Sequence, residues 1–206
     1  MSFDKLVAEL KNKSNSKKAE IQMGFFKTEK GNYSHGDIFI GITVPDQRNI
    51  AKKYLDLPLH DVQKLLKSKI HEHRLVGLII LTSKYKKDKK LHVEFYLKNT
   101  TNVNNWDLVD TSASKILGDW LIDKDKSILY KLASSDNLWE KRISIVSTFA
   151  FIQKKQLEDT FKISEILLDD KHDLIHKAVG WMLREAGKKD QNALKKFLKK
   201  HYKKNA

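Results

Sequence analysis

Residues 140–146 read EKRISIV, a polar start that includes the basic residues Lys141 and Arg142, followed by a largely apolar run. Two similar stretches are EHRLVGL at 72–78 and IHKAVGW at 175–181. Their basic residues at the third position are Arg74, Arg142 and Lys177, which lie 68 and 35 residues apart, or about two periods and one. A period near 35 in a helical pattern predicts helix pairs stacked one on the next.

Longer units surround these stretches, and each unit carries two helical patterns in which a polar turn precedes the second, more apolar helix. The units are 61–87, 91–121, 126–153 and 161–188. We expect an all-α fold, a short α-solenoid, with an irregular helical bundle as the alternative. Equivalent positions of a solenoid face one concave surface, so Arg74, Asp110, Arg142 and Lys177 are expected to share a groove.

The N-terminal part predicts two helices, over 3–13 and 17–27, and then an interruption. The interruption, 28–44, contains three glycines and ends in a β-branched run. We expect a loop there, with a short hairpin as a variant. Pro45 suits a first helical turn, and Asp46 suits the positive end of that helix.

Composition restricts the class of protein. The 206 residues include 40 Lys and Arg against 26 Asp and Glu, a formal charge of +14 that favours a polyanion. Nucleic acid is the first candidate partner, an anionic membrane surface the second, and a merely basic soluble protein the alternative. The absence of cysteine excludes disulfides, thiolate zinc sites and cysteine nucleophiles. The start lacks a signal-peptide core, and the longest apolar run, LVGLIIL at 75–81, is too short to span a bilayer. We expect one soluble intracellular domain, 1–206.

Trp106 and Asp110 are four residues apart, which places them on one side of a helix. The apolar residues beside them mark a core face with Asp110 at its border: Val109, Ala113, Ile116, Leu117, Trp120 and Leu121. Two interpretations are open. Asp107 or Asp110 complements the helix N-terminus while Trp106 packs the repeat, or both side chains belong to a site.

Arg142 lies at the border of another apolar run, 143–152, and a partly buried guanidinium needs an anion. If Asp110 is that anion, the Asp110–Arg142 pair is structural. If a phosphate is that anion, Arg142 is a ligand-binding residue. Trp181 follows Lys177 by four positions. It belongs either to the core or to a surface that packs on sugars and bases.

Other chemistries have little support. His71 and His73 point in different directions on a helix and make a poor metal pair. Neither an HExxH motif nor a GxxxxGK phosphate loop occurs. We therefore expect no metal and no cofactor.

Three motifs follow one another along the chain: NNWDLVDTSASKILGD at 104–119, SSDNLWEKRISIV at 134–146 and IHKAVGWMLRE at 175–185. Together they resemble the DNA alkylation repair family of HEAT-like-repeat DNA glycosylases, of the AlkD type. The likeness runs from about residue 45 to the end of the chain. The segment 28–44 is longer and richer in glycine than expected for this family, so contacts of the N-terminal helices do not follow from the resemblance.

The resemblance implies a right-handed solenoid of HEAT-like repeats with a concave basic groove. The family's W-x3-D motif matches Trp106 and Asp110, its W-x2-R arginine matches Arg142, and its GW tryptophan matches Trp181. These four are the implied catalytic residues. The implied DNA-binding residues are Arg142, Trp106, Trp181, Lys177, Arg74 and Arg48.

The implied reaction is hydrolysis of the N-glycosidic bond of cationic N3- or N7-alkylpurines, such as 3-methyladenine and 7-methylguanine, in duplex DNA. Asp110 would stabilise the cationic sugar and orient water. The two tryptophans would pack against deoxyribose, and Arg142 would hold a phosphate. We expect a cytoplasmic monomer, nucleoid-associated when bound to DNA, that needs no metal or membrane.

Two other functions remain open. One is a non-catalytic helical-repeat protein that binds damaged or branched DNA, which the basic tail and the glycine-rich segment also suit. The other is a solenoid that binds acidic peptides, which leaves Asp110 and the tryptophans without a purpose. Release of free purine separates the first alternative from a glycosylase.

Overall fold

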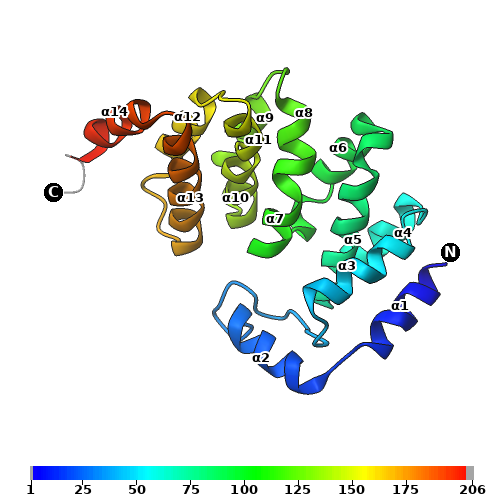
Figure 1. Cartoon of the computed structure of the whole chain (residues 1–206). Helices are drawn as coiled ribbons and strands as arrows, with labels where there is room; N and C mark the ends of the chain where they lie inside the picture. Colours follow the sequence, from blue (N-terminus) through cyan, green and yellow to red (C-terminus); the bar gives the residue numbers. More distant parts are fainter. Residues whose placement is uncertain (1, 203–206) are drawn as a thin grey trace. The chain divides into compact units, whose positions relative to one another are not determined.

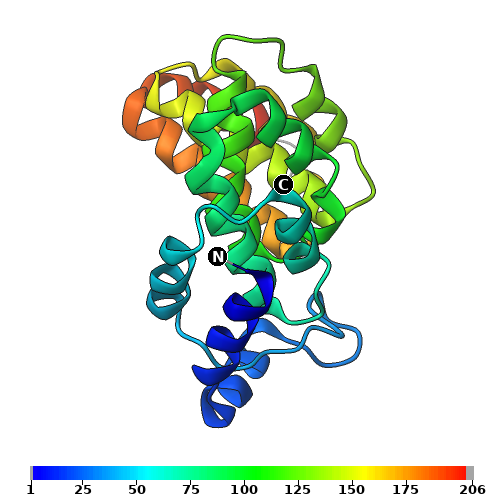
Figure 2. The ribbon, with the colours of Figure 1, turned by 90° about the vertical axis from the view of Figure 1, so that its right-hand side faces the viewer.

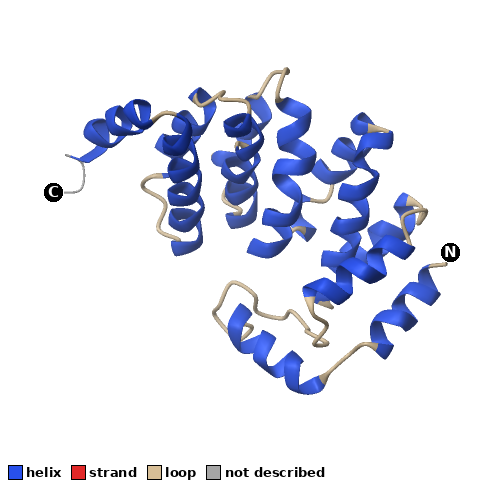
Figure 3. Cartoon of the chain, viewed as in Figure 1, coloured by secondary structure: helices blue, strands red, loops and turns tan. Residues whose placement is uncertain are grey.

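The computed structural model describes residues 2–202, and within them it contains helices and no strand (Figure 3). The all-α prediction is confirmed. The chain divides into two compact units, one up to Ser112 and one from Ala113 onward.

The first unit holds two short helices, a long loop and the first helix pairs (Figure 1). In chain order its elements are α1 Phe3–Asn12, α2 Ser16–Phe26, α3 Val44–Lys53, α4 Leu59–Leu66, α5 His71–Lys84, the 3-10 helix η1 Tyr85–Lys87, α6 Lys89–Leu97, the 3-10 helix η2 Thr100–Asn102 and most of α7 Trp106–Ala113. Side-chain caps fix several helix starts: Ser2 accepts the Lys5 N–H, and Asn15 accepts the Lys18 N–H. The helices expected over 3–13 and 17–27 are thus present.

Helix α5 forms the centre of this unit, with α3 and α4 packed against it. Its side chains from His71 to Leu78 are all buried, although the first four are polar. Around it lies an apolar core that excludes water almost completely: Leu57, Val62, Leu65, Leu78, Ile80 and Leu81. A helix buried on nearly every side must satisfy its polar residues internally.

Between α2 and α3 the chain runs as an irregular segment, Lys27–Thr43, visible as a long loop (Figures 1 and 2). The prediction of a loop over 28–44 is confirmed, and its variant with a short hairpin was wrong. The only β-like pairing recorded in residues 2–202 is an isolated parallel bridge between Ile38 and Ile70. Ile38 N–H donates to Lys69 O (3.0 Å), and His71 N–H donates to Ile38 O (2.8 Å). Ile38, the first β-branched residue of the run, therefore pairs with the residues that lead into α5.

The expected helix start at Pro45 is confirmed. Thr43 caps α3 by accepting the Asp46 N–H, and Pro45 stands in the first turn. Pro lacks the N–H that a first turn leaves unpaired, so it costs nothing there.

The second unit consists of shorter helices followed by two longer ones (Figure 1). Its elements are the π-helix η3 Ser114–Gly118, α8 Asp119–Leu121, α9 Ser127–Ala133, α10 Leu138–Ser147, α11 Phe149–Gln153, α12 Glu158–Leu167, α13 Asp173–Lys189 and α14 Gln191–Tyr202. Helix α10 packs between α9 and α13, and α13 in turn packs against α12 and α14. The helix pairs expected over 126–153 and 161–188 are present.

A glycine allows η3 to approach α10 closely. A Cβ added to Gly118 would lie 2.3 Å from the Ser147 carbonyl oxygen. Ser147 is buried and donates its hydroxyl to Ile143 O (2.7 Å) within α10. Backbone-to-backbone packing at this point therefore requires a residue without a side chain.

Candidate functional site

Trp106 and Asp110 lie one turn apart on α7, and both side chains are half-buried. Below them in the core of the first unit is Tyr96 of α6, which is fully buried. Its hydroxyl donates to Ser112 Oγ (3.1 Å), since Ser112 donates its own proton to Leu108 O (2.7 Å). Burial raises the pKa of Tyr96, and the negative charge of Asp110 raises it further. Tyr96 is therefore a neutral phenol close to the charge of Asp110.

An aromatic cluster holds the indole of Trp106. Phe26 stacks on it with ring centroids 5.2 Å apart and planes 15° apart. The exposed ring of Phe25 meets it edge-on at 5.9 Å. Phe39 stacks on the other side of Phe26 at 4.8 Å. The interpretation of Trp106 as a packing residue is thus correct for one face of its ring, while part of the side chain stays accessible.

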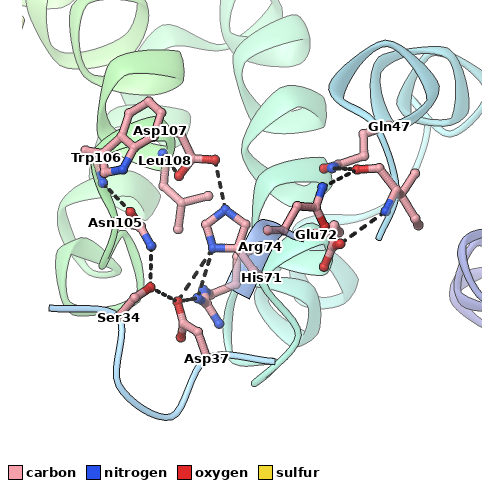
Figure 4. Close-up of polar contacts among 12 residues, drawn as sticks. Ser34, Asp37, Gln47, His71, Glu72, Arg74, Asn105, Trp106, Asp107 and Leu108 are labelled. Atoms are coloured by element: carbon pink, nitrogen blue, oxygen red, sulfur yellow. Dashed lines mark hydrogen bonds and ion pairs between the residues drawn. The ribbon is translucent and has the colours of Figure 1, made fainter. Parts of the chain in front are cut away.

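A chain of hydrogen bonds connects the irregular segment to the start of α7 (Figure 4). Asn105 Oδ1 accepts the Trp106 N–H (2.8 Å), and Asn105 Nδ2 donates to Ser34 Oγ (2.7 Å). Ser34 in turn donates to Asp37 Oδ2 (3.1 Å). Ser34 and Asn105 are almost wholly buried, so the loop is fixed against α7 by bonds that water does not compete for.

His71 lies between two carboxylates in this network (Figure 4). Its Nε2 is 2.8 Å from Asp107 Oδ2 on α7, and its Nδ1 is 3.6 Å from Asp37 Oδ2 in the loop. Arg74 of α5 completes the cluster, with Nη2 2.6 Å from the same Asp37 oxygen and Nη1 donating to Ser68 O (2.8 Å). The imidazole also stacks on Phe39 at 4.5 Å.

The charges of this cluster shift the pKa values of its members in opposite directions. Burial disfavours the imidazolium, and so does Arg74, but Asp107 and Asp37 outweigh both, so the pKa of His71 is raised above its ordinary 6.5. Burial also disfavours ionised Asp37, yet His71 and Arg74 together lower the pKa of that carboxyl below its ordinary 3.8. The folded cluster therefore favours the state with both groups charged.

These shifts predict how stability varies with pH. Ionised Asp37 stabilises the folded state above pH 3.8, and this stabilisation is lost as pH falls through its lowered pKa. His71 contributes fully below pH 6.5 and loses its contribution as pH rises through its raised pKa. We expect urea unfolding to show a fall in stability on the alkaline side that His71→Phe removes. His60→Gln, at an exposed histidine, is the control that keeps it. An alkaline fall of the same size in His71→Phe would assign it to other groups.

Glu72 anchors the end of the irregular segment to α5. Its side chain is 0% exposed. Oε1 accepts the backbone N–H groups of Ile40 (3.0 Å), Gly41 (2.8 Å) and Ile42 (3.3 Å), and Oε2 accepts that of Ile40 as well (3.2 Å). Three successive N–H groups directed at one carboxylate satisfy a buried charge without a cation.

In the second unit Arg142 is an interior residue, only 5% exposed. Its Nη1 donates to the carbonyl of Leu174 (2.6 Å), in the first turn of α13. The helix that carries it is capped by Asn137, whose Oδ1 accepts the N–H groups of Trp139 and Glu140. Arg142 thus helps to fix the start of α13.

Helix α13 carries the predicted residues Lys177 and Trp181. Lys177 is exposed, as are Gly180 and Arg184 beside it, and Trp181 is half-buried with its ring 5.9 Å from Phe149. The spacing of these positions places them on one side of the helix. The opposite side forms the core: Ile175, Ala178, Val179, Met182, Leu183 and Ala186. The Lys177–Asp173 ion pair is exposed and so contributes little to stability.

The predicted residues are thus divided between the units. Trp106, Asp110, Arg74 and the exposed Arg48 of α3 lie in the first, and Arg142, Lys177 and Trp181 lie in the second. Arg74 does not fit a DNA-facing surface, because Asp37 already neutralises its charge. The expectation of one groove lined by all four equivalent positions stays a prediction only for Asp110, Arg142 and Lys177.

Three residues that sequence reasoning missed are His71, Asp37 and Glu72. The signal was present, since four polar residues, HEHR, open the most deeply buried helix of the first unit and must each have a partner. The groups that face His71, Glu72 and Arg74 from the irregular segment could not be found from the sequence, because that segment has no periodic pattern. Asp107, interpreted as a helix N-terminal acid, is also the partner of His71.

The net charge of each unit and the arrangement of possible metal ligands limit the chemistry of the site. Each unit carries 20 Lys and Arg against 13 Asp and Glu, so the net charge of +7 is the same in both. In the described part of the chain no group of three or more His, Asp or Glu side chains is arranged to hold a metal ion. No helix within residues 2–202 combines the length and apolarity that crossing a membrane requires.

Comparison with known proteins defines the class. A family model described as DNA alkylation repair enzyme matches residues 6–206. A solved structure, the predicted DNA alkylation repair enzyme from Enterococcus faecalis, is 18% identical and superposes with a TM-score of 0.74, over 91% of this chain and 90% of that one. This likeness shows a shared fold. No curated protein matches the chain.

The chain belongs to the DNA alkylation repair enzyme family. Membership assigns it a role in the repair of alkylated DNA, with DNA as the substrate.

Proposed function

We propose that this protein is a monofunctional DNA glycosylase that removes cationic N3- or N7-alkylpurines, such as 3-methyladenine and 7-methylguanine, from duplex DNA. The observation that carries the proposal is the half-buried carboxylate of Asp110, one turn from the partly accessible indole of Trp106, in a chain of this family. We propose further that the protein acts as a monomer in the cytoplasm.

The chemistry needs little beyond a placed carboxylate. Alkylation gives the purine a positive charge, so it leaves as a neutral base when the electrons of the glycosidic bond pass to its ring nitrogen. The sugar then carries the positive charge, as in glycoside cleavage generally. Asp110 stabilises this cation and accepts a proton from the water whose oxygen bonds to the sugar carbon. No metal or cofactor takes part in these steps.

Trp106 offers an electron-rich ring face to the cation and excludes water on that side. Its ring is held by Phe26 and Phe25, so it is rigid before substrate arrives. In the second unit Trp181 and Lys177 contact a sugar–phosphate backbone. Arg142 serves as a phosphate contact and also fixes the first turn of α13 through Leu174. Backbone contacts of this kind dominate affinity for DNA.

The test is release of free base. Purified protein is incubated with duplex DNA that contains 7-methylguanine and 3-methyladenine, and released purines are measured by chromatography against a control without protein. We expect methylated purines to appear in free form while the DNA strand stays intact at neutral pH. Tight DNA binding with no released base would support the non-catalytic binder.

Gly180 gives a prediction for the α13 surface in which stability and affinity change in opposite directions. It stands in the middle of a 17-residue helix, and a Cβ added there would meet nothing within 4 Å. A glycine inside a helix lowers the free energy of unfolding by roughly 1 kcal/mol relative to Ala, and at Gly180 no internal packing requires it. Because Lys177 and Trp181 flank it, we expect the DNA backbone to approach the helix at this glycine. Gly180→Ala should stabilise the fold by about 1 kcal/mol yet weaken DNA binding several-fold.

Urea unfolding and fluorescence anisotropy with labelled duplex DNA measure the two effects. Gly180→Leu, which adds more bulk, should weaken binding further. Ser83→Ala, at an exposed helical position of α5 outside the proposed contacts, should leave affinity unchanged. A more stable Gly180→Ala protein with wild-type affinity would remove this part of α13 from the interface.

A further inference from the structure

We propose that His71 is a positioning residue: as an imidazolium it ties the irregular segment Lys27–Thr43 to the first turn of α7 and thereby holds Trp106 and Asp110 in their reactive arrangement. The inference rests on the proposed function, since it assigns a role within that reaction. It also gives the glycine-rich segment a purpose that its sequence does not suggest.

The first observation is the balance of charge around the ring. His71 is 2% exposed, and its Nε2 lies 2.8 Å from Asp107 Oδ2 on α7. Its Nδ1 lies 3.6 Å from Asp37 Oδ2 in the segment and 3.5 Å from Arg74 Nη2. Arg74 of α5 supplies one positive charge. Two buried carboxylates are balanced only when the imidazole carries the second. A neutral ring keeps the hydrogen bond to Asp107 but has no charge to attract Asp37, and it leaves an excess negative charge in the cluster.

The second observation is that three connections from this cluster converge on the same helical turn, and Figure 4 shows the two that consist of polar contacts. Asp107 binds His71 through Oδ2, while its Oδ1 accepts the Leu108 N–H (2.9 Å), so the carboxylate is fixed to the turn that carries it. Asp37 accepts from Ser34, whose hydroxyl oxygen receives the Asn105 amide.

The third connection is a stack of rings. It runs from His71 to Phe39 (4.5 Å), from Phe39 to Phe26 (4.8 Å) and from Phe26 to Trp106 (5.2 Å). The His71 ring also lies 5.0 Å from Phe26. Rings in direct contact transmit small displacements because a packed core has no free volume to absorb them.

Loss of the proton from His71 would release one of its two carboxylates. The turn that carries Trp106 and Asp110 would then lose one of its three connections to the segment. A shift of about 1 Å at reacting groups is enough to reduce a rate by roughly 10²-fold. The structure therefore predicts an effect on the rate of base release at saturating protein, with little effect on DNA affinity.

The experiment measures single-turnover base release and DNA affinity from pH 6 to 9 for wild type, His71→Phe and His71→Gln, with His60→Gln as the control. His71→Phe keeps the ring stack but cannot bind either carboxylate, and we expect its rate at neutral pH to fall roughly 10²-fold. His71→Gln keeps one hydrogen-bond donor but no titrating proton. We expect its rate of base release to lie between those of His71→Phe and wild type. We also expect it to lack the decline in rate at alkaline pH that wild type and His60→Gln show. Circular dichroism and urea unfolding confirm that each variant is folded under assay conditions.

Two outcomes would overturn the inference. One is a folded His71→Phe protein with the wild-type rate. The other is an alkaline decline that is the same in His71→Gln and wild type. If His71→Phe does not fold, Asp37→Asn tests the same connection, since it removes the charge in the segment while Arg74 and His71 stay; an unchanged rate profile there would be equally decisive.

A readout without catalysis separates this inference from the proposed function. The indole N–H resonance of Trp106, assigned by its loss in Trp106→Phe, should shift with pH at the midpoint of His71 in wild type and stay constant in His71→Gln. If wild type releases no base, the glycosylase proposal fails, and this titration decides whether His71 positions Trp106. A Trp106 resonance that does not respond to pH would overturn the inference whatever the activity.

Discussion

Asp110→Asn should lose base release by roughly 10²–10³-fold while its affinity for duplex DNA stays close to that of wild type. The substitution keeps the shape of the side chain and removes its negative charge. Stabilisation of the cationic sugar depends on that charge, whereas binding depends on positive groups elsewhere in the molecule. The half-buried position of Asp110 makes its electrostatic effect stronger than that of a solvated carboxylate.

Single-turnover assays with excess protein isolate the chemical step, and anisotropy measures binding to the same lesion-containing duplex. Asp123→Asn, at an exposed acid of the second unit, is the matched control and should behave as wild type. Asp110→Ala should be no more active than Asp110→Asn, because the charge and not the hydrogen-bonding oxygen matters. Wild-type excision by folded Asp110→Asn would remove Asp110 from the mechanism.

Glu72→Ala should destabilise the fold by about 4 kcal/mol, the largest stability effect expected for this chain. The carboxylate is 0% exposed and accepts the N–H groups of Ile40, Gly41 and Ile42. Truncation leaves these three donors buried without a partner and opens a cavity at the start of α5. Each unpaired buried donor costs about 1–3 kcal/mol.

The free energy of unfolding, from urea or guanidinium titration, measures this effect. Glu29→Ala is the control, since Glu29 lies in the same irregular segment but is exposed, and we expect it to change stability by less than about 0.5 kcal/mol. Glu72→Gln should be intermediate because its amide keeps one oxygen for the three donors. A Glu72→Ala protein as stable as Glu29→Ala would mean that water replaces the carboxylate.

Much of the fold follows from pattern alone. The helices around Phe3, Ala19 and Pro45 and the pairs α4–α5, α9–α10 and α12–α13 appear where periodicity and start signals place them. These elements depend on local rules: apolar spacing, capping residues and the fixed φ of proline. The irregular segment did not follow from such rules, because its conformation depends on Glu72 and His71, about 30 residues further along the chain.

The candidate site was predictable to the extent that it lies on one helix. Trp106 and Asp110 share a side of α7 as their spacing requires. The burial of Arg74 could not be predicted. Its place in a repeat suggested an exposed cation, because its partner Asp37 lies in a segment without periodicity. Burial of a charged residue depends on a long-range partner, which spacing within a single sequence does not contain.

Gly41 carries a consequence for the ancestry of this segment. Its φ is +81°, and a Cβ there would lie 2.0 Å from the Asn15 carbonyl oxygen and 2.7 Å from the Ala19 nitrogen. Its N–H is also the shortest of the bonds to Glu72. Both residues serve the same turn, so we expect a lineage that acquires or deletes the loop to exchange both together. Paired inheritance of a glycine and a glutamate about 30 positions apart would therefore mark relatives that share this N-terminal architecture.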